Sequence, residues 1–270
     1  MIPIFLINLK QSVERRKYVT DQLEKLGLSY NIFDAYLGKD YYKDKDFYDE
    51  KKALKFEHRK LKIGEVGCSL SHNAIYKKIV KDKIPYALIL EDDIILNEKL
   101  PLFLENIEKY LKGNMVINIS RCDVYKKKNQ KNVFENFYLV SPRYIKYGGI
   151  ACACGYIVTL DAAKIMQDCN KPVYFPADAW GYYLNKVNFY GIIPTLTLIT
   201  QNVSDFYSTI QSDGIGIYKG KKESSALQTS TKFVPHRMLM YHFKTKTILG
   251  RFIASVLRPF YRFLKKLLKK

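Results

Sequence analysis

Short apolar runs rich in β-branched residues alternate with helical segments along the first 200 residues, and this alternation constrains the fold more than any other feature. Such a chain folds most simply as a sheet covered by helices. The predicted strands cover residues 3–9, 28–36, 85–90, 115–119, 137–140, 151–160 and 189–199, and the predicted helices cover residues 12–26, 69–81, 100–111 and 161–169. The sequence therefore predicts an α/β protein with a mostly parallel central sheet, in which the polar residues 126–132 form a loop.

The clearest predicted strand is followed directly by three acidic residues. It runs from Pro85 to Leu90, and Glu91, Asp92 and Asp93 come next. Ligands of open α/β sheets bind at the carboxyl ends of the strands, which is where these carboxylates fall. Mg²⁺ and Mn²⁺ take carboxylate oxygens together with substrate phosphates, so the cluster predicts a metal–nucleotide site. The alternative is a solvated turn in which one aspartate caps the next element.

Composition excludes several classes of protein. The chain has 270 residues, 47% of them apolar, which excludes intrinsic disorder as its main state. Its formal net charge is +19, but only nine of the 45 basic residues are arginine and no nucleic-acid-binding motif occurs, so we expect no nucleic acid partner. The five cysteines form no CxxC pair, which predicts reduced and mostly buried thiols.

The charge is concentrated at the end of the chain. Residues 236–270 hold ten basic and no acidic residues, and from position 248 onward apolar and aromatic residues recur at helical spacing. This pattern is typical of an amphipathic helix lying on an anionic membrane surface, although Pro259 would kink or divide it. The alternatives are a terminal helix packed on the domain and an oligomer contact. We predict one domain over residues 1–235 and a membrane-associating tail over 236–270, with no signal peptide and no transmembrane helix.

Several segments together resemble glycosyltransferase family 25, which includes bacterial lipooligosaccharide and lipopolysaccharide glycosyltransferases and is related to collagen galactosyltransferases. Residues 7–16 resemble its "INL…RR" element, and residues 64–72 its "GE-x-GC-x-LSH" element. Residues 88–93 resemble its "LILEDD" element, the family's counterpart of the DxD motif. Residues 155–163 and 176–178 resemble its later "GY-x" and "P-x-D" elements, so the resemblance extends over about residues 2–210.

The resemblance implies a fold, a reaction and partners. The fold would be GT-A-like, a nucleotide-sugar-binding α/β domain. The reaction would be transfer of a hexose with inversion at its anomeric carbon, most often of galactose from UDP-galactose. Mn²⁺ or Mg²⁺ would be the cofactor. The acceptor would be a lipid-linked oligosaccharide of lipooligosaccharide or lipopolysaccharide. The enzyme would then be peripheral, at the cytoplasmic face of the bacterial inner membrane, with an oligomeric state that the sequence does not indicate.

The same resemblance suggests ligands for the donor. Asp93, with Glu91 or Asp92, would hold the metal that bridges the two phosphates of the donor. Asn8 lies at the end of the first strand, where its amide would contact the uracil or ribose. Arg15 and Arg16 lie on the following helix, where one of them would reach the diphosphate. The alternative for both arginines is a solvated helix face.

Four further residues are candidates near the chemistry. Ser71 and His72 are expected to open the helix after the glycine-rich turn, near the diphosphate, because helix N-termini favour anions. The alternatives are a local backbone hydrogen bond for Ser71 and a satisfied, half-buried side chain for His72. Asp178 is the candidate base, because it opens a short helix beside Trp180, whose ring would stack on a sugar; the alternative is an N-cap. Glu65, on the glycine-flanked turn, is the second candidate base.

Two other functions fit the same sequence. One is a different nucleotide-sugar or nucleotidyl transferase that uses the same acidic cluster. The other is a non-enzymatic, basic membrane-binding module, whose function would survive loss of the acidic cluster but not of the tail.

Overall fold

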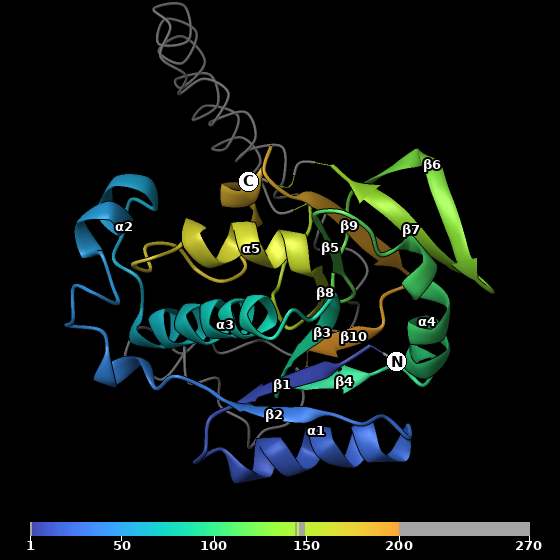
Figure 1. The fold of residues 1–270 in the computed structure, drawn as a ribbon, viewed down its shortest axis with the longest axis horizontal. Coiled ribbons are helices and arrows are strands. Elements are labelled where there is room, and N and C mark those ends of the chain that lie inside the picture. Colours follow the sequence, from blue (N-terminus) through green and yellow to red (C-terminus); the bar gives the residue numbers. More distant parts are fainter. Residues whose placement is uncertain (1, 144, 146–148, 200–270) are drawn as a thin grey trace, which may run out of the picture. The chain divides into compact units, whose positions relative to one another are not determined.

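We analysed a computed structural model that describes residues 2–143, 145 and 149–199 (Figure 1). The predicted domain boundary at residue 235 and the amphipathic tail lie outside the described residues. An eight-stranded sheet has the order β2-β1-β3-β8-β5-β9-β7-β6. Its strands are β1 (Ile4–Asn8), β2 (Asn31–Asp34), β3 (Tyr86–Glu91), β5 (Met115–Asn118), β6 (Tyr125–Phe134), β7 (Phe137–Pro142), β8 (Gly155–Thr159) and β9 (Asn188–Ile193). A separate antiparallel pair joins β4 (Ile94–Leu96) and β10 (Thr197–Ile199).

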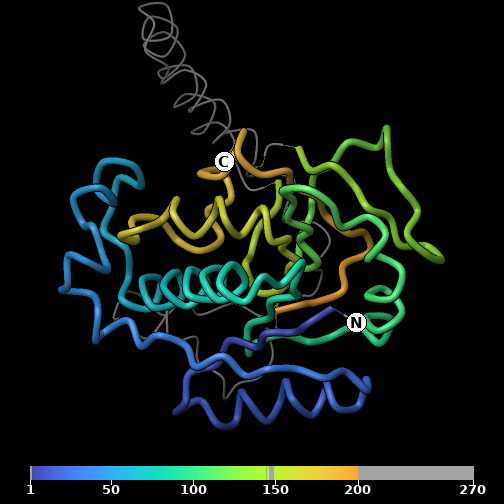
Figure 2. Tube along the Cα trace, in the orientation of Figure 1, coloured from blue at the N-terminus to red at the C-terminus, as the bar shows by residue number. Residues whose placement is uncertain are grey.

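Helices cover both faces of the large sheet. They are α1 (Val13–Lys25), α2 (Glu50–Phe56), α3 (Ile63–Lys81), α4 (Leu100–Ile107) and α5 (Leu160–Cys169), with 3₁₀ turns η1 (Gly38–Asp40), η2 (Glu108–Tyr110) and η4 (Trp180–Tyr183). Successive side chains of a strand point to opposite faces. Accordingly Ile4 and Leu6 of β1 share a core with α1 and α4, whereas Phe5 and Ile7 share one with α3 and α5. Figure 2 shows α3 and α5 side by side on one face and α1 beyond β2.

The α/β class is confirmed, but the prediction of a mostly parallel sheet is wrong. β1 pairs in parallel with β2 and β3, and β5 pairs in parallel with β9. β8, however, lies between β3 and β5 and runs antiparallel to both, and the β6–β7 and β7–β9 pairs are antiparallel as well. The error has a simple cause: a fully buried strand is apolar along its whole length, so its sequence does not reveal its direction.

The helix α3 begins earlier than predicted, so Gly64 and Gly67 lie within its first turns and not in a turn before it. Glycine occurs at position 67 because the backbone of α3 closely approaches the loop after β2. A Cβ at Gly67 would lie 2.6 Å from the carbonyl oxygen of Tyr36 and 2.7 Å from the nitrogen of Gly38. A Cβ at Gly38 would lie 2.0 Å from the carbonyl oxygen of Ile63. Glycine is therefore needed here for contact between α3 and the loop after β2, not for a turn before the helix.

Two further local predictions are wrong. Residues 126–132 are not a loop: they belong to the edge strand β6, whose lysines are exposed. Charged side chains are common on edge strands, where they discourage pairing with other chains. The segment after Asp178 is the 3₁₀ turn η4 and not an α-helix, and the N-cap of α5 is Thr159, whose side chain accepts a bond from the nitrogen of Ala162.

The cysteines also depart in part from the expected pattern. Cys152 and Cys154 form a disulfide, where we had expected reduced thiols. Cys68, Cys122 and Cys169 are free, as predicted. Among the helices that the structure describes, none is both long enough and apolar enough to cross a lipid bilayer.

Candidate active site

The acidic cluster lies at the carboxyl end of β3, beside the carboxyl end of β1. The two strands are parallel, and their register sets Ile7 opposite Glu91. Asn8 and the three carboxylates therefore meet at one edge of the sheet. They line a cavity of about 270 Å³. Its wall is completed by the start of α1, the loop after β2 and the first turns of α3, and it includes Arg15, Tyr36, Leu37, Gly38, Lys39, Gly64, Gly67, Cys68 and Ser71.

Asp92 is held by the protein itself. Its Oδ2 accepts a hydrogen bond from Asn8 Nδ2 at 2.6 Å, and its Oδ1 forms an ion pair with Arg15. Asn8 Nδ2 also donates to the carbonyl of Ser12, and Asn8 Oδ1 accepts from Arg16 Nε at 2.8 Å. The amide of Asn8 is thus engaged on both sides. Asn8, Arg16 and Asp92 together connect the ends of β1 and β3 to the start of α1.

Asp93 faces the cavity beside Arg15. One Nη of Arg15 lies 3.1 Å from Asp93 Oδ2. Burial and the negative charge of Glu91 raise the pKa of Asp93 to about 7, with Arg15 opposing this shift. Arg15 Nε is buried and has no hydrogen-bond partner among the residues that the structure describes. A buried donor without a partner is costly, and an anionic ligand in the cavity would satisfy it.

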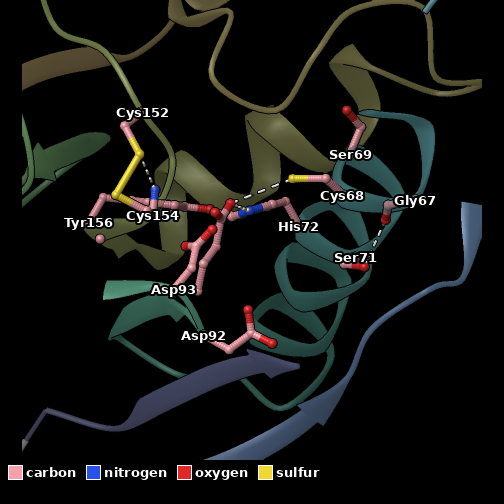
Figure 3. A network of polar contacts seen from close by, with 12 residues as sticks. Gly67, Cys68, Ser69, Ser71, His72, Asp92, Asp93, Cys152, Cys154 and Tyr156 are labelled. Carbon is pink, nitrogen blue, oxygen red and sulfur yellow. Dashed lines mark hydrogen bonds and ion pairs between the residues drawn. A yellow bond between two sulfur atoms is a disulfide. The ribbon is translucent and has the colours of Figure 1, made fainter. Parts of the chain in front are cut away.

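Glu91 belongs to a different network from Asp92 (Figure 3). His72 Nε2 lies 3.0 Å from Glu91 Oε1, and His72 Nδ1 lies 2.6 Å from the hydroxyl of Tyr156. That hydroxyl in turn lies 2.7 Å from the hydroxyl of Tyr76, and Cys68 Sγ donates to Glu91 Oε1 at 3.5 Å. Burial raises the pKa of Glu91. The hydrogen bonds from His72 and Cys68 and the charge of Arg15 together lower it by more than burial raises it, so the net shift is downward.

Ser71 and His72 do not open a helix. They lie in the middle of α3, because that helix begins at Ile63, so the argument from helix N-termini does not apply to them. Ser71 Oγ accepts from the nitrogen of Tyr36 and donates to the carbonyl of Gly67, which is the local backbone role given as its alternative. His72 is satisfied, as the alternative stated, but it is fully buried and not half-buried, and it contacts Glu91 of the acidic cluster.

Glu65 lies in the first turn of α3 and not on a glycine-flanked turn. Its carboxylate accepts two bonds from the guanidinium of Arg59, at 2.7 and 2.8 Å, and one from the nitrogen of Lys62. Burial raises the pKa of Glu65, but these bonds lower it further, so the net shift is downward. The bond from the nitrogen of Lys62, the N-cap residue, therefore helps Glu65 to stabilise the start of α3.

Asp178 precedes η4 and is exposed to solvent. The protein packed on its inner side and the charge of Glu91 raise the pKa of Asp178. Trp180 was expected to stack on a sugar ring. The structure contradicts this, because Trp180 is fully buried and packs edge-on against Tyr156 and Phe189.

Cys68 and Tyr156 were not predicted as part of the site. Burial and the negative charges of Glu91 and Asp178 raise the pKa of Cys68, and burial and the neighbouring Tyr76 raise that of Tyr156. The spacing of Cys68 and His72, one helical turn apart, is the signal that could have indicated a shared face. For Tyr156, the signal in the sequence was its place in the "GY-x" element of residues 155–163.

The fold and the site together define an α/β protein with an acidic cavity at the carboxyl ends of two parallel strands, β1 and β3. The chain belongs to glycosyltransferase family 25, since the model described as "Glycosyltransferase family 25 (LPS biosynthesis protein)" matches residues 1–180. This range contains the whole acidic cluster and every candidate residue named above.

Individual relatives match part of the chain. A "Glycosyltransferase 25 family member" of Drosophila pseudoobscura is 29% identical over 59% of this chain and 26% of its own length. Human procollagen galactosyltransferase 2 is 27% identical, over 62% of this chain and 27% of its own length. Lipooligosaccharide biosynthesis protein lic2B of Haemophilus influenzae is 25% identical, over 59% and 60%. The chain thus spans about a quarter of the length of the insect and human relatives and about three fifths of lic2B.

Among solved structures, one similar chain is a glycosyltransferase involved in glycosylation of the major capsid of PBCV-1. Its TM-score is 0.40 at 11% identity, over 75% of this chain and 94% of that chain. At this TM-score the similarity carries no argument about function.

Proposed function

We propose that this protein is an inverting, metal-dependent glycosyltransferase with a GT-A-like fold. It would transfer a hexose, galactose from UDP-galactose, to an oligosaccharide of lipooligosaccharide or lipopolysaccharide. The observation that carries the proposal is the meeting at one cavity of Asp93, Glu91 and Arg15, whose Nε has no hydrogen-bond partner among the described residues. Carboxylates suit a divalent cation, and a buried guanidinium suits a diphosphate. The name of lic2B, a lipooligosaccharide biosynthesis protein, agrees with the proposed acceptor, and the name of the human galactosyltransferase agrees with the proposed sugar.

The residues at the cavity fit a hard divalent cation. Asp93 and Glu91 both line the cavity, and each raises the cost of ionising the other. Both carboxylate oxygens of Asp92 are already bound, one by Asn8 and the other by Arg15, so we assign Asp92 the role of positioning these two side chains. The metal is assigned to Asp93 with Glu91. When bound, Mn²⁺ or Mg²⁺ would neutralise the charge that develops on the departing diphosphate. This narrows the expectation from the sequence, which gave the metal to Asp93 together with Glu91 or Asp92.

The protein would hold the donor chiefly through Arg15. Its Nε, which no group in the described part of the chain accepts from, would donate to a phosphate oxygen, while one Nη is held by Asp92 and Asp93. Arg16 is bound to Asn8 and to the carbonyl of Lys10, so it shapes the loop and does not face a ligand. The nucleoside would lie against the loop of residues 35–39, which forms the opposite wall.

Asp178 remains our candidate for the base that takes the acceptor proton. It is exposed and has a raised pKa, both of which suit proton transfer at neutral pH. Glu65 is less suitable because Arg59 and the nitrogen of Lys62 hold its carboxylate. Asp178→Asn should lower kcat by about 10²–10⁴-fold with an unchanged KM for the donor. Normal turnover by this variant would reject the role.

The site of action follows from the proposed acceptor. A lipid-linked oligosaccharide is presented at a membrane, and the basic tail of residues 236–270 would place the enzyme on the anionic cytoplasmic surface. A test is sedimentation of the full chain with anionic liposomes at low salt. Binding that falls with added salt is the expected result, and a protein that stays in the supernatant would contradict it.

A panel of UDP-sugars tests the reaction itself. The full chain is incubated with each sugar and with lipooligosaccharide acceptors, with and without Mn²⁺, and UDP release is measured. We expect Mn²⁺-dependent release that is highest with UDP-galactose and requires the acceptor. Release from another donor would support a different nucleotide-sugar transferase. No release from any donor, with liposome binding retained, would favour the membrane-binding module.

A further inference from the structure

Three different metal-binding side chains converge at one end of the acidic cluster. Cys68 and His72 lie one turn apart on α3, and Glu91 ends β3. Their ligand atoms, the thiol sulfur, the imidazole Nε2 and a carboxylate oxygen, all lie within 4.8 Å of one another. His72 Nε2 and Cys68 Sγ lie 3.0 and 3.5 Å from the same oxygen of Glu91. Figure 3 shows the side chains of Cys68 and His72 leaving α3 on the same side.

This arrangement suits an ion other than Mn²⁺ or Mg²⁺. In a tetrahedral zinc site, bonds of about 2.0–2.3 Å set neighbouring ligand atoms about 3.3–3.6 Å apart. The two separations from Glu91 Oε1, 3.0 Å to His72 Nε2 and 3.5 Å to Cys68 Sγ, are close to these, so small rotations of the side chains would admit the ion. Thiolate and imidazole ligands select Zn²⁺ and similar transition metals, whereas carboxylate oxygens alone suit Mn²⁺ and Mg²⁺. We propose that Cys68, His72 and Glu91 form a second metal site, which binds a divalent transition-metal ion of the Zn²⁺ type.

The surroundings supply what such a site requires. Cys68 and Glu91 line the cavity, which gives the ion a path in and leaves a fourth position for water. His72 Nδ1 lies 2.6 Å from the Tyr156 hydroxyl, and that hydroxyl can donate onward to Tyr76. An imidazole that donates from Nδ1 presents the lone pair of Nε2 to the metal, as second-shell partners of zinc-bound histidines commonly arrange. On binding, the thiol of Cys68 loses its proton to water and the Sγ–metal bond forms.

The new site shares one ligand with the proposed donor site. Glu91 would be drawn toward Cys68 and His72 when the second ion is bound, and away from an ion held by Asp93. Zn²⁺ would then oppose Mn²⁺, an effect that rests on the proposed glycosyltransferase function. Binding at Cys68 does not depend on that function, so the two can fail separately.

Cobalt provides a direct test because it reports its own ligands. The full chain, freed of metal, is titrated with Co²⁺ without any sugar donor, and absorption is recorded. We expect a thiolate-to-cobalt charge-transfer band and the visible bands of a four-coordinate ion, reaching a plateau at one equivalent and abolished by one equivalent of Zn²⁺. Cys68→Ser should remove the charge-transfer band, and His72→Asn should weaken binding at least about tenfold.

The matched control is Cys169→Ser, a change at another free cysteine, remote from the acidic cluster in the sequence. This variant should keep the band at full intensity. Circular dichroism and thermal unfolding would establish that each variant is folded. A band that survives Cys68→Ser, a band that requires Cys152 or Cys154, or no thiolate band in the folded wild-type protein would each overturn the proposal.

Discussion

Asn8 and Asp92, 84 residues apart in the sequence, are joined by a hydrogen bond of 2.6 Å between two buried side chains. The bond connects the carboxyl ends of β1 and β3. It also sets the direction of the acidic cluster, because it turns Asp92 toward α1 and leaves Asp93 to face the cavity.

Asn8→Ala should lower the free energy of unfolding by about 1–3 kcal/mol. The change leaves Asp92 Oδ2 without this donor and Arg16 Nε without this acceptor, in a buried site. Urea unfolding measures the effect. The control is Asn188→Ala, which removes an exposed bond to Asn114 and should cost no more than about 0.5 kcal/mol. Equal losses in the two variants would contradict the structural role of Asn8.

Asp93→Asn should change how stability depends on pH when a chelator keeps the protein free of metal. The pKa of Asp93 is raised to about 7 in the folded protein, from 3.8, so folding favours the protonated form. Stability from this group is therefore fully present below pH 3.8 and is lost as the pH rises toward 7. The variant lacks this loss, so it should match the wild type near pH 4 and exceed it near pH 8. Thermal unfolding across this range tests the sign, and a less stable variant at pH 8 would contradict it.

Glu65→Gln should reduce stability and leave transfer nearly unchanged. Glu65 binds Arg59 and caps α3, and its loss should cost about 1–3 kcal/mol at pH 7. Because the pKa of Glu65 is lowered in the folded protein, its stabilisation is present above its ordinary value of 4.5 and is lost as the pH falls further. The difference from wild type in urea unfolding should shrink accordingly below pH 4.5. Unchanged stability with a 100-fold loss of kcat would instead make Glu65 the base.

Gly67→Ala should weaken both the fold and donor binding. The added methyl would meet Tyr36 and Gly38 at less than 3 Å, so the cavity wall must move, at a cost of about 1–3 kcal/mol. We expect a raised KM for the donor together with a lower unfolding midpoint. Gly113→Ala is the control, since its methyl meets no atom within 4 Å and its cost comes only from a positive φ of 62°. A KM raised equally by both variants would contradict the argument.

Much of the site could be predicted because its signals are local in the sequence. The apolar run before Glu91 identified β3, and the following acids fall at its carboxyl end as expected. The direction of β8 could not be predicted, since the sequence of a strand that is buried on both faces is apolar throughout and does not show which way the strand runs. The edge strand β6 was missed for the opposite reason, because most of its side chains are exposed.

Long-range contacts account for the remaining errors at the site. Gly67 looked like a turn residue, but its lack of a side chain serves a contact with a loop about 30 residues away. Trp180 looked like a sugar-stacking residue, but it fills the core against Tyr156 and Phe189. The division of labour between Asp92 and Asp93 depends on Asn8 and Arg15, which neighbouring sequence does not reveal.

The most direct test of the account is UDP release by the full chain from UDP-galactose and a lipooligosaccharide acceptor, in excess chelator and after restoring Mn²⁺. The account predicts that the chelator abolishes release, that Mn²⁺ restores it, and that Asp93→Asn lowers it at least about 10²-fold with the fold intact. Full activity in excess chelator, or in the Asp93→Asn variant, would contradict it.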